Sequence, residues 1–428
     1  RWSNRPANTL RSIYLPWFPQ TMATPEQQRA ALLALKREQP EVAWKLALAM
    51  LPDHHSTAMP TARPSWRNFI AEDWSEGVTW GVRWGQEEFA ADLAIQLAGT
   101  DPTKLAEIVE QSAMLQEPSL EALIARLTSP DVVGLDEETR TPLWQTVEAE
   151  VLKHRKFADA AWAMPAARIE RLAAISKALA PKAPAFRHRR LFADRSVELY
   201  EGRGNYEEES ARLERRRLTA VSEVAIDGGP SAVLAFAETV DSPWTVGIAF
   251  ASAGSQEADQ VFLPVLLGSE DGPRYSFLAG YVAHRRRLAG WEWVDSLPVS
   301  TWTPADRGRF LSLLPFDQPT WDRVAGLLGQ DAAEYWTRTG AQPYHTDGDL
   351  AVGADGLLAH GRPRAALHCL HWLSKVKKQT DSVRILRALD SAMQVEDRGQ
   401  IDGHEVAELF DALQQDPSVD QDALLLAE

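Results

Sequence analysis

Glycine and proline break this chain into short apolar segments, and this punctuation constrains the fold more than any other feature of the sequence. Residues 350–373, which read LAVGADGLLAHGRPRAALHCLHWL, show it best. Apolar and small residues recur at helical spacing on both sides of Gly361, and Pro363 suits the first turn of a new helix. Small residues near the turn let two helices approach closely, so we predict a helix hairpin here.

The same punctuation recurs along the whole chain. Thr24 before Pro25 is a typical N-cap, and Pro40 opens another apolar helical stretch, so the two predict a second pair of helices. Similar short segments follow as far as the end of the chain. We therefore predict an all-α fold, an α-solenoid of antiparallel helix hairpins. The best rival strand is WTVGIAF, residues 244–250.

Two stretches depart from this pattern. Residues 53–83 contain turn formers and little periodicity, which predicts an irregular Trp-rich loop. We expect its tryptophans to fill gaps between hairpins; they are Trp66, Trp74, Trp80 and, just beyond it, Trp84. Residues 181–204 mix proline with arginine and predict a connector. The expected domains are an N-terminal helical array, residues 1–180, and a C-terminal helical repeat array, residues 205–428.

The composition excludes several classes of protein. Of 428 residues, 45% are hydrophobic and 25% charged, so the chain can bury a large core and is not disordered. The net charge of −15 argues against a general nucleic-acid binder. Cys369 is the only cysteine, which rules out an intramolecular disulfide and fits a reducing compartment. No run approaches the roughly 18 apolar residues that a membrane span needs, so we expect a cytoplasmic protein without a membrane partner.

Catalytic motifs are missing from the sequence. It contains no GxxxxGK[ST] phosphate loop, no HExxH zinc motif and no GxSxG nucleophile elbow. We therefore expect no enzymatic activity and no cofactor.

Several residues resemble metal ligands in the printed sequence. On a helix His368 and His371 share a face, while Cys369 points about 100° away, so we favour packing over a metal site. We read His54 and His55 as exposed surface. Calcium is suggested by Asp347, Asp349 and Asp355 and by residues 397–405, but neither set follows the EF-hand order of ligands, so turn and cap roles are expected.

Three basic clusters stand out in this acidic chain. One interpretation is that they are solvated helix faces paired with nearby glutamates. The other is a docking surface for an acidic partner or a phosphate backbone. The candidate partner-binding residues are Arg187, Arg189, Arg190, Arg215, Arg216, Arg217, Arg285, Arg286 and Arg287.

Residues 357–370, LLAHGRPRAALHCL, resemble the small-residue core of a tetratricopeptide hairpin, and the helical pattern is similar to tetratricopeptide-like and HEAT-like arrays. The segments LPWFPQT, PEVAWKLALAMLP and RPSW ahead of the long helical array also resemble the C-terminal region of large bacterial signal-transducing NTPases of the STAND type, some of which are antiviral sensors. This resemblance implies a sensor arm that binds a foreign protein and releases an N-terminal effector.

Our first hypothesis is a protein-binding helical repeat module, the sensor or scaffold part of a larger bacterial signalling or antiphage defence protein. Its partner would be another protein, foreign or phage-encoded, or a domain of the same parent chain. The alternatives are a helical nucleic-acid-binding or processing protein that uses the basic clusters, and a scaffold that dimerises through its aromatic surface. Because the chain starts at Arg1 and ends within an apolar helical pattern, we expect a piece of a longer protein.

Overall fold

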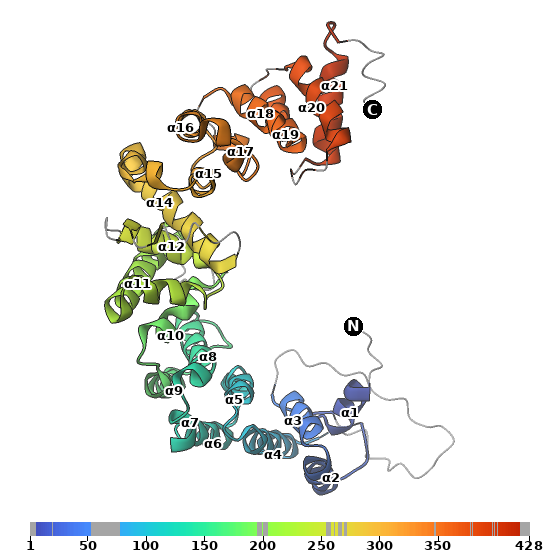
Figure 1. The fold of residues 1–428 in the computed structure, drawn as a ribbon. Coiled ribbons are helices and arrows are strands. Elements are labelled where there is room, and N and C mark those ends of the chain that lie inside the picture. Colours follow the sequence, from blue (N-terminus) through green and yellow to red (C-terminus); the bar gives the residue numbers. More distant parts are fainter. Residues whose placement is uncertain are drawn as a thin grey trace. The chain divides into compact units, whose positions relative to one another are not determined.

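A computed structural model describes residues 6–18, 20–52, 78–194, 199, 204–253, 258–260, 262–263, 268, 272–345, 348–376, 378, 380–395, 397, 399 and 401–419. The described residues form α-helices, short 3-10 helices, turns and loops, and no strand is found among them (Figure 1). The predicted all-α class is confirmed, and the packed helices are consistent with a helical repeat array. The rival strand at residues 244–250 is wrong, because it lies inside helix α12 (Pro243–Ser252).

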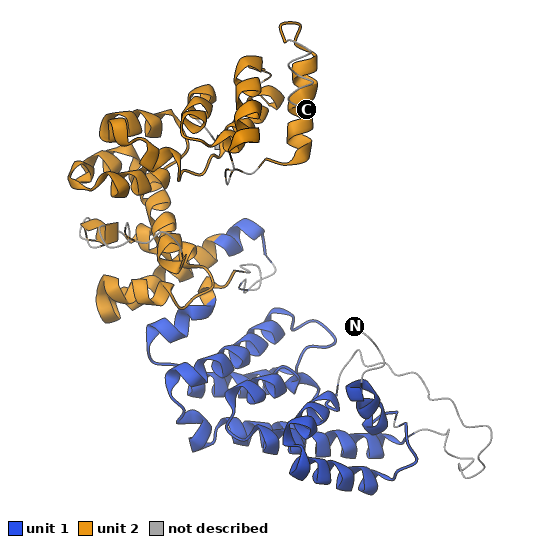
Figure 2. Cartoon of the chain, turned by 45° about the vertical axis from the view of Figure 1, so that its right-hand side comes forward, with its two compact units in different colours: residues 1–190, 197–210 blue, residues 191–196, 211–428 orange. Residues whose placement is uncertain are grey.

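The chain divides into two compact units, residues 1–190 with 197–210, and residues 191–196 with 211–428 (Figure 2). The division falls within and just after the predicted connector, residues 181–204. Part of that connector is helical, since it contains α10 (Pro184–His188) and the 3-10 helix η3 (Arg189–Phe192).

The first unit begins with a short N-terminal helix; some of its helices pack against their neighbours in sequence, and others pack against helices further along the chain. Besides α10 and η3 its helices are α1 (Pro6–Tyr14), α2 (Pro25–Glu38), α3 (Pro40–Ala49), α4 (Trp80–Ala98), α5 (Pro102–Val109), η2 (Ser112–Met114), α6 (Glu117–Leu127), α7 (Pro130–Val133), α8 (Glu137–Lys156) and α9 (Ala166–Leu179).

Helices of the second unit also pack in pairs, with α12 against α14 and α18 against α19. Besides α12 they are α11 (Tyr206–Ala237), whose first residues belong to the first unit, α14 (Gly272–Ser296), η5 (Val299–Thr301), α15 (Pro304–Ser312), α16 (Gln318–Leu328), η6 (Gly329–Asp331), α17 (Ala333–Trp336), η7 (Pro343–His345), α18 (Leu350–Ala359), α19 (Pro363–Lys375), α20 (Ser382–Gln394) and α21 (Gly403–Gln414).

Helix starts agree with the caps read from the sequence. Thr24 accepts a hydrogen bond from the backbone N–H of Gln27, and the Gln27 side chain accepts one from the N–H of Thr24, which forms a capping box. Proline at the first turn of α2 and α3 fits the fixed φ that a helix start needs. The predicted helices after Thr24 and Pro40 are therefore confirmed.

The turn at Gly361 forms as its sequence predicts. Gly361 has φ of +72°, and the N–H groups of Gly361 and Arg362 donate to the carbonyls of Leu358 and Leu357 at 3.3 and 2.9 Å. This is the Schellman arrangement, which satisfies the last carbonyls of α18 before α19 begins. The apolar residues on both sides, including Ala354 and Leu370, are buried, and the two helices pack together.

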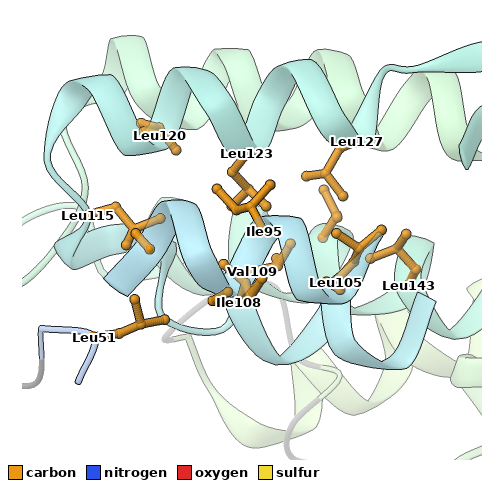
Figure 3. Packing of buried hydrophobic residues seen from close by; sticks show 14 of the residues in the cluster. Leu51, Ile95, Leu105, Ile108, Val109, Leu115, Leu120, Leu123, Leu127 and Leu143 are labelled. Carbon is orange, nitrogen blue, oxygen red and sulfur yellow. The ribbon is translucent and has the colours of Figure 1, made fainter. Parts of the chain in front are cut away.

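One hydrophobic cluster holds the first unit together. Leucine, isoleucine and valine side chains from α4, α5, α6 and α8 gather in one layer (Figure 3). Leu105, Ile108 and Leu123 are fully buried there. Each such side chain contributes about 1.5–3 kcal/mol relative to an exposed one. Leu51, just after α3, belongs to the same cluster and fixes the end of that helix.

Glycines interrupt two long helices of the second unit. The φ of Gly229 is +69°, so α11 is two helices merged across a kink. Gly290, with φ of +68°, kinks α14 in the same way. Among described helices α11 is also long and apolar enough on average for a membrane span, but the core helix of a water-soluble protein meets the same criterion.

The predicted irregular loop is only partly visible. Residues 53–77, with Trp66 and Trp74, lie outside the described residues. From Trp80 onward the chain is already helical, so α4 starts earlier than the sequence pattern indicated. Trp80 and Trp84 do not fill gaps, because they are 63% and 48% exposed; their ring centroids lie 5.8 Å apart with the rings tilted.

Two glycines let α12 and α14 touch backbone to backbone. A Cβ at Gly247 would lie 2.1 Å from the carbonyl oxygen of Phe277, and one at Gly280 would lie 2.2 Å from that of Trp244. No side chain fits there without moving a helix.

We predict that Gly280→Ala lowers the free energy of unfolding by about 1–3 kcal/mol, because the added methyl overpacks this contact. Gly326→Ala in α16 is the matched control: nothing lies within 4 Å of its Cβ position, and alanine should gain up to about 1 kcal/mol there. Urea unfolding measures both. Equal effects of the two substitutions would contradict the close approach.

Candidate functional site

A groove of ≈ 580 Å³ lies in the first unit where several helices end. Its size is within the range of ligand sites. Apolar residues form most of the wall and polar residues of both charges the remainder. The apolar residues are Leu48, Ala49, Leu51, Pro52, Ala113, Met114 and Trp162; the polar ones are Arg11, Glu110, Gln111, Lys153 and His154.

Helix packing fixes the position of these groups. The groove is lined by the last turn of α3, the residues just after α5, and the last turn of α8. Leu51 belongs to the hydrophobic cluster, and Leu48 packs against it. The apolar floor is therefore continuous with the core, and Trp162 joins it from the turn between α8 and α9.

Cations lie at the C-terminal ends of two of these helices, α3 and α8. Arg11 from α1 donates through Nε to the carbonyl of Ala49 at 3.3 Å, at the end of α3. Lys153 in the last turn of α8 binds both carboxylate oxygens of Glu150 at 3.0 Å. Positive charge at helix C-termini is favourable, since the unpaired carbonyls there carry partial negative charge.

His154 is the most deeply buried polar group of the groove, with 1% of its side chain exposed. Its Nδ1 accepts a hydrogen bond from the backbone N–H of Met164 at 3.1 Å, which places the proton of the neutral ring on Nε2. Nε2 lies 3.4 Å from a carboxylate oxygen of Glu150 but makes no hydrogen bond. Burial lowers the pKa of His154 and raises that of Glu150.

Trp162 forms the exposed aromatic edge of the groove. It is 41% exposed, and its ring meets the ring of His154 edge-on at 5.5 Å. The ring of Phe157 also packs against it, with a centroid distance of 5.6 Å. The indole is therefore held in place and remains accessible, while Met114 lies in the same wall.

Two of the predicted partner-binding arginines have structural roles. Arg217, 5% exposed, donates through Nε to the carbonyl of Leu191 at 2.8 Å. Arg285 binds the buried Asp259 at 2.8 Å, and Tyr281 and Trp293 donate to the same carboxylate at 2.6 and 2.9 Å. Both therefore hold the second unit together. Charge reversal at these positions would damage the fold before it tested any docking surface.

The other predicted arginines lie nearer the surface. Arg187 donates to the carbonyls of Pro181 and Lys182, Arg189 lies over Phe186, and Arg286 lies 4.4 Å from the centroid of the Trp291 ring. The first cluster belongs to the first unit and the rest to the second. Their docking role stays a prediction; the positions with exposed side chains are Arg187, Arg215 and Arg287, while Arg189, Arg190, Arg216 and Arg286 are half-buried.

His368 and His371 share one face of α19, as expected, and bind glutamates of α21. His368 Nδ1 lies 3.1 Å from Glu405, and His371 Nε2 lies 2.8 Å from Glu408. Cys369 points into the core, where burial raises its pKa to about 12. In the part of the chain that the structure describes, no three His, Cys, Asp or Glu side chains are arranged to hold a metal ion.

The suspected calcium ligands act in caps and ion pairs where they can be seen. Asp349 caps α18 by accepting from the N–H of Ala351, and Asp402 caps α21 in a capping box. Asp355 pairs with Arg384 at 2.9 Å. The expected turn and cap roles are thus confirmed for Asp349 and Asp402. Asp347, His54 and His55 lie outside the described residues.

No family model, curated protein or solved structure matches this chain. The resemblances to tetratricopeptide, HEAT and STAND proteins therefore stay predictions.

The groove itself was not predicted from the sequence. Lys153 and His154 belong to a basic helix end, KHRK, a few residues before Trp162. A basic helix end followed by an aromatic loop was the available signal. That signal gave no information on Arg11 or Glu110, which other segments bring to the groove.

We predict that Arg285→Met lowers the free energy of unfolding by about 3–5 kcal/mol, because it leaves the carboxylate of Asp259 buried without its cation. Arg215→Met, on the exposed surface of α11, should stay within about 0.5 kcal/mol. Urea unfolding followed by circular dichroism compares them. If both variants match the wild type, the Asp259 network is not structural.

We predict that stability falls as the pH drops from 7.5 to 5.5, in part through His154. Its folded pKa is lowered below the unfolded value of about 6.5, so its contribution is complete above that value and is lost as the pH falls through the folded pKa. His154→Gln should flatten this dependence in urea titrations. Burial also lowers the pKa of His284. Because His284 is present in both proteins, its effect cancels when the two pH curves are compared. Parallel pH curves would rule out the assignment.

Proposed function

We propose that this chain is a protein-binding helical module and that its groove holds a segment of the partner protein. The observation that carries the proposal is the fixed, 41% exposed Trp162 at the edge of an apolar groove with charges of both signs. Protein partners bind through such places, since buried aromatic anchors surrounded by polar groups contribute most of the energy of an interface.

The wall of the groove suits an extended polypeptide. Leu48, Leu51 and Met114 offer an apolar surface for one side chain of the partner, and methionine adapts to different shapes. Backbone groups of the partner meet donors at Lys153 and an acceptor at Glu110. A peptide presents the same alternation of apolar side chains and polar backbone groups.

We extend the proposal to the parent protein. The module acts as the sensor or scaffold part of a larger bacterial signalling or antiphage defence protein, and its partner is a foreign protein. This step is supported by the resemblance of residues 15–21, 40–52 and 63–66 to the sensor region of STAND-type NTPases.

The test is site-specific photo-crosslinking in lysates of bacteria with and without phage infection. A photoreactive phenylalanine replaces Gln111 in the groove or, as a control, Val383 on α20, which is 78% exposed. We expect a partner band from position 111 alone, and we expect Trp162→Ala to remove it. The proposal fails if position 383 captures the same band, if Trp162→Ala leaves the band unchanged, or if position 111 captures none.

A further inference from the structure

Two arginines of the second unit lie over the same tryptophan ring, in the second half of α14. The guanidinium carbons of Arg286 and Arg323 lie 4.4 and 4.2 Å from the centroid of the Trp291 ring. Arg323 binds both carboxylate oxygens of Asp295 at 2.8 Å and donates to the carbonyl of Pro319, also at 2.8 Å. Arg323 therefore shows how the chain itself completes a guanidinium that lies on this ring.

No oxygen among the described residues completes Arg286 in this way, whether from a carboxylate, a carbonyl or a hydroxyl. Its Nε is buried, so no ligand can reach that atom. The two terminal nitrogens are not buried, so they remain open to an oxygen from outside the chain. Stacking on Trp291 holds the group in place, which reduces the conformational entropy that binding costs.

The charges beside Arg286 favour an anion. Arg287 is exposed and donates to Nδ1 of His284 at 2.9 Å, which leaves the rest of its donors to solvent. Glu292, next to Trp291 in the sequence, is exposed and opposes an anion. Two cations and one carboxylate make this patch positive, although the whole chain carries a net charge of −15. That net charge disfavours a nucleic acid, which presents a long row of phosphates.

We propose that Arg286 on Trp291 recognises a carboxylate in an acidic segment of a partner protein. The planar carboxylate accepts two parallel hydrogen bonds from the terminal nitrogens of Arg286, and Arg287 attracts the neighbouring acid of the segment. Tryptophan and arginine are enriched among the residues that contribute most to protein interfaces. This surface belongs to the second unit, so the inference goes beyond the groove and does not rest on the proposed function.

The experiment uses the whole chain labelled with 5-fluorotryptophan, in which Trp291→Phe assigns the ¹⁹F resonance of Trp291. The probes are peptides capped at both ends, acetyl-Ser-Glu-Glu-Ser-amide and its forms with Gln-Gln or Lys-Lys at the centre. A short DNA duplex is the probe for a phosphate backbone. Titration gives a Kd for each probe from the shift of the Trp291 resonance.

We expect the Glu-Glu peptide to bind about tenfold more tightly than the Gln-Gln peptide, and the Lys-Lys peptide to bind least. Arg286→Gln should remove that advantage. Arg286→Lys should lose most of it, because lysine keeps the charge without the planar fork. Arg387→Gln, which changes an exposed arginine of α20, is the matched control and should leave the Kd unchanged. Thermal unfolding as in the wild type shows that the Arg286 variants are folded.

Glu292→Gln tests the patch without touching the arginines. It removes the opposing carboxylate, so it should tighten the binding of the Glu-Glu peptide several-fold. This arm decides the inference even where an Arg286 variant fails to fold. An unchanged or weaker affinity would contradict the proposed place of the carboxylate.

Five further results would overturn the inference. If the Glu-Glu and Gln-Gln peptides bind equally, or if no probe shifts Trp291, the patch does not recognise a carboxylate. If Arg286→Lys binds as tightly as the wild type, charge alone acts and the fork has no role. If Arg387→Gln weakens binding as much as Arg286→Gln, the attraction is not specific to this patch. If the DNA duplex binds more tightly than the Glu-Glu peptide, the occupant is a nucleic acid. None of these results bears on crosslinking from position 111, which tests the proposed function in the first unit.

Discussion

Burial of apolar faces between short helices is the constraint on which the rest of this structure depends. Short helices such as α5, with 8 residues, are marginal alone in water, because helix nucleation is costly and a short helix gains few hydrogen bonds. The cluster around Leu105, Ile108 and Leu123 supplies the stabilisation in the first unit. The same packing brings the ends of α3, α5 and α8 together, so the groove is a product of the core.

Charged residues in this chain have roles that their spacing in the sequence does not reveal. Arg285 and Arg287 are two residues apart, yet one binds the buried Asp259 and the other is exposed. His154 and Lys153 are adjacent, and helix geometry turns one into the core while the other stays at the surface. Electrostatic arguments from clusters of arginine therefore need the fold before individual residues can be assigned.

Much of the fold could be predicted from the sequence, because its signals are local. Thr24, Pro363 and Gly361 each act on the backbone within one turn, so the helix starts and the turn between α18 and α19 follow from residue type. The groove could not be predicted, since Arg11, Glu110 and Lys153 meet only through packing between segments distant in sequence. Trp80 and Trp84 show the same limit: their type favours burial, but their position on α4 leaves them exposed.

The central claim is that the chain meets its partner at the groove formed by the ends of α3, α5 and α8. Amide hydrogen exchange of the chain alone and with its captured partner tests this most directly. The claim predicts new protection in residues 48–52, 110–114 and 153–164, with unchanged exchange in residues 363–375. Protection confined to the second unit, or no change near the groove, would contradict it.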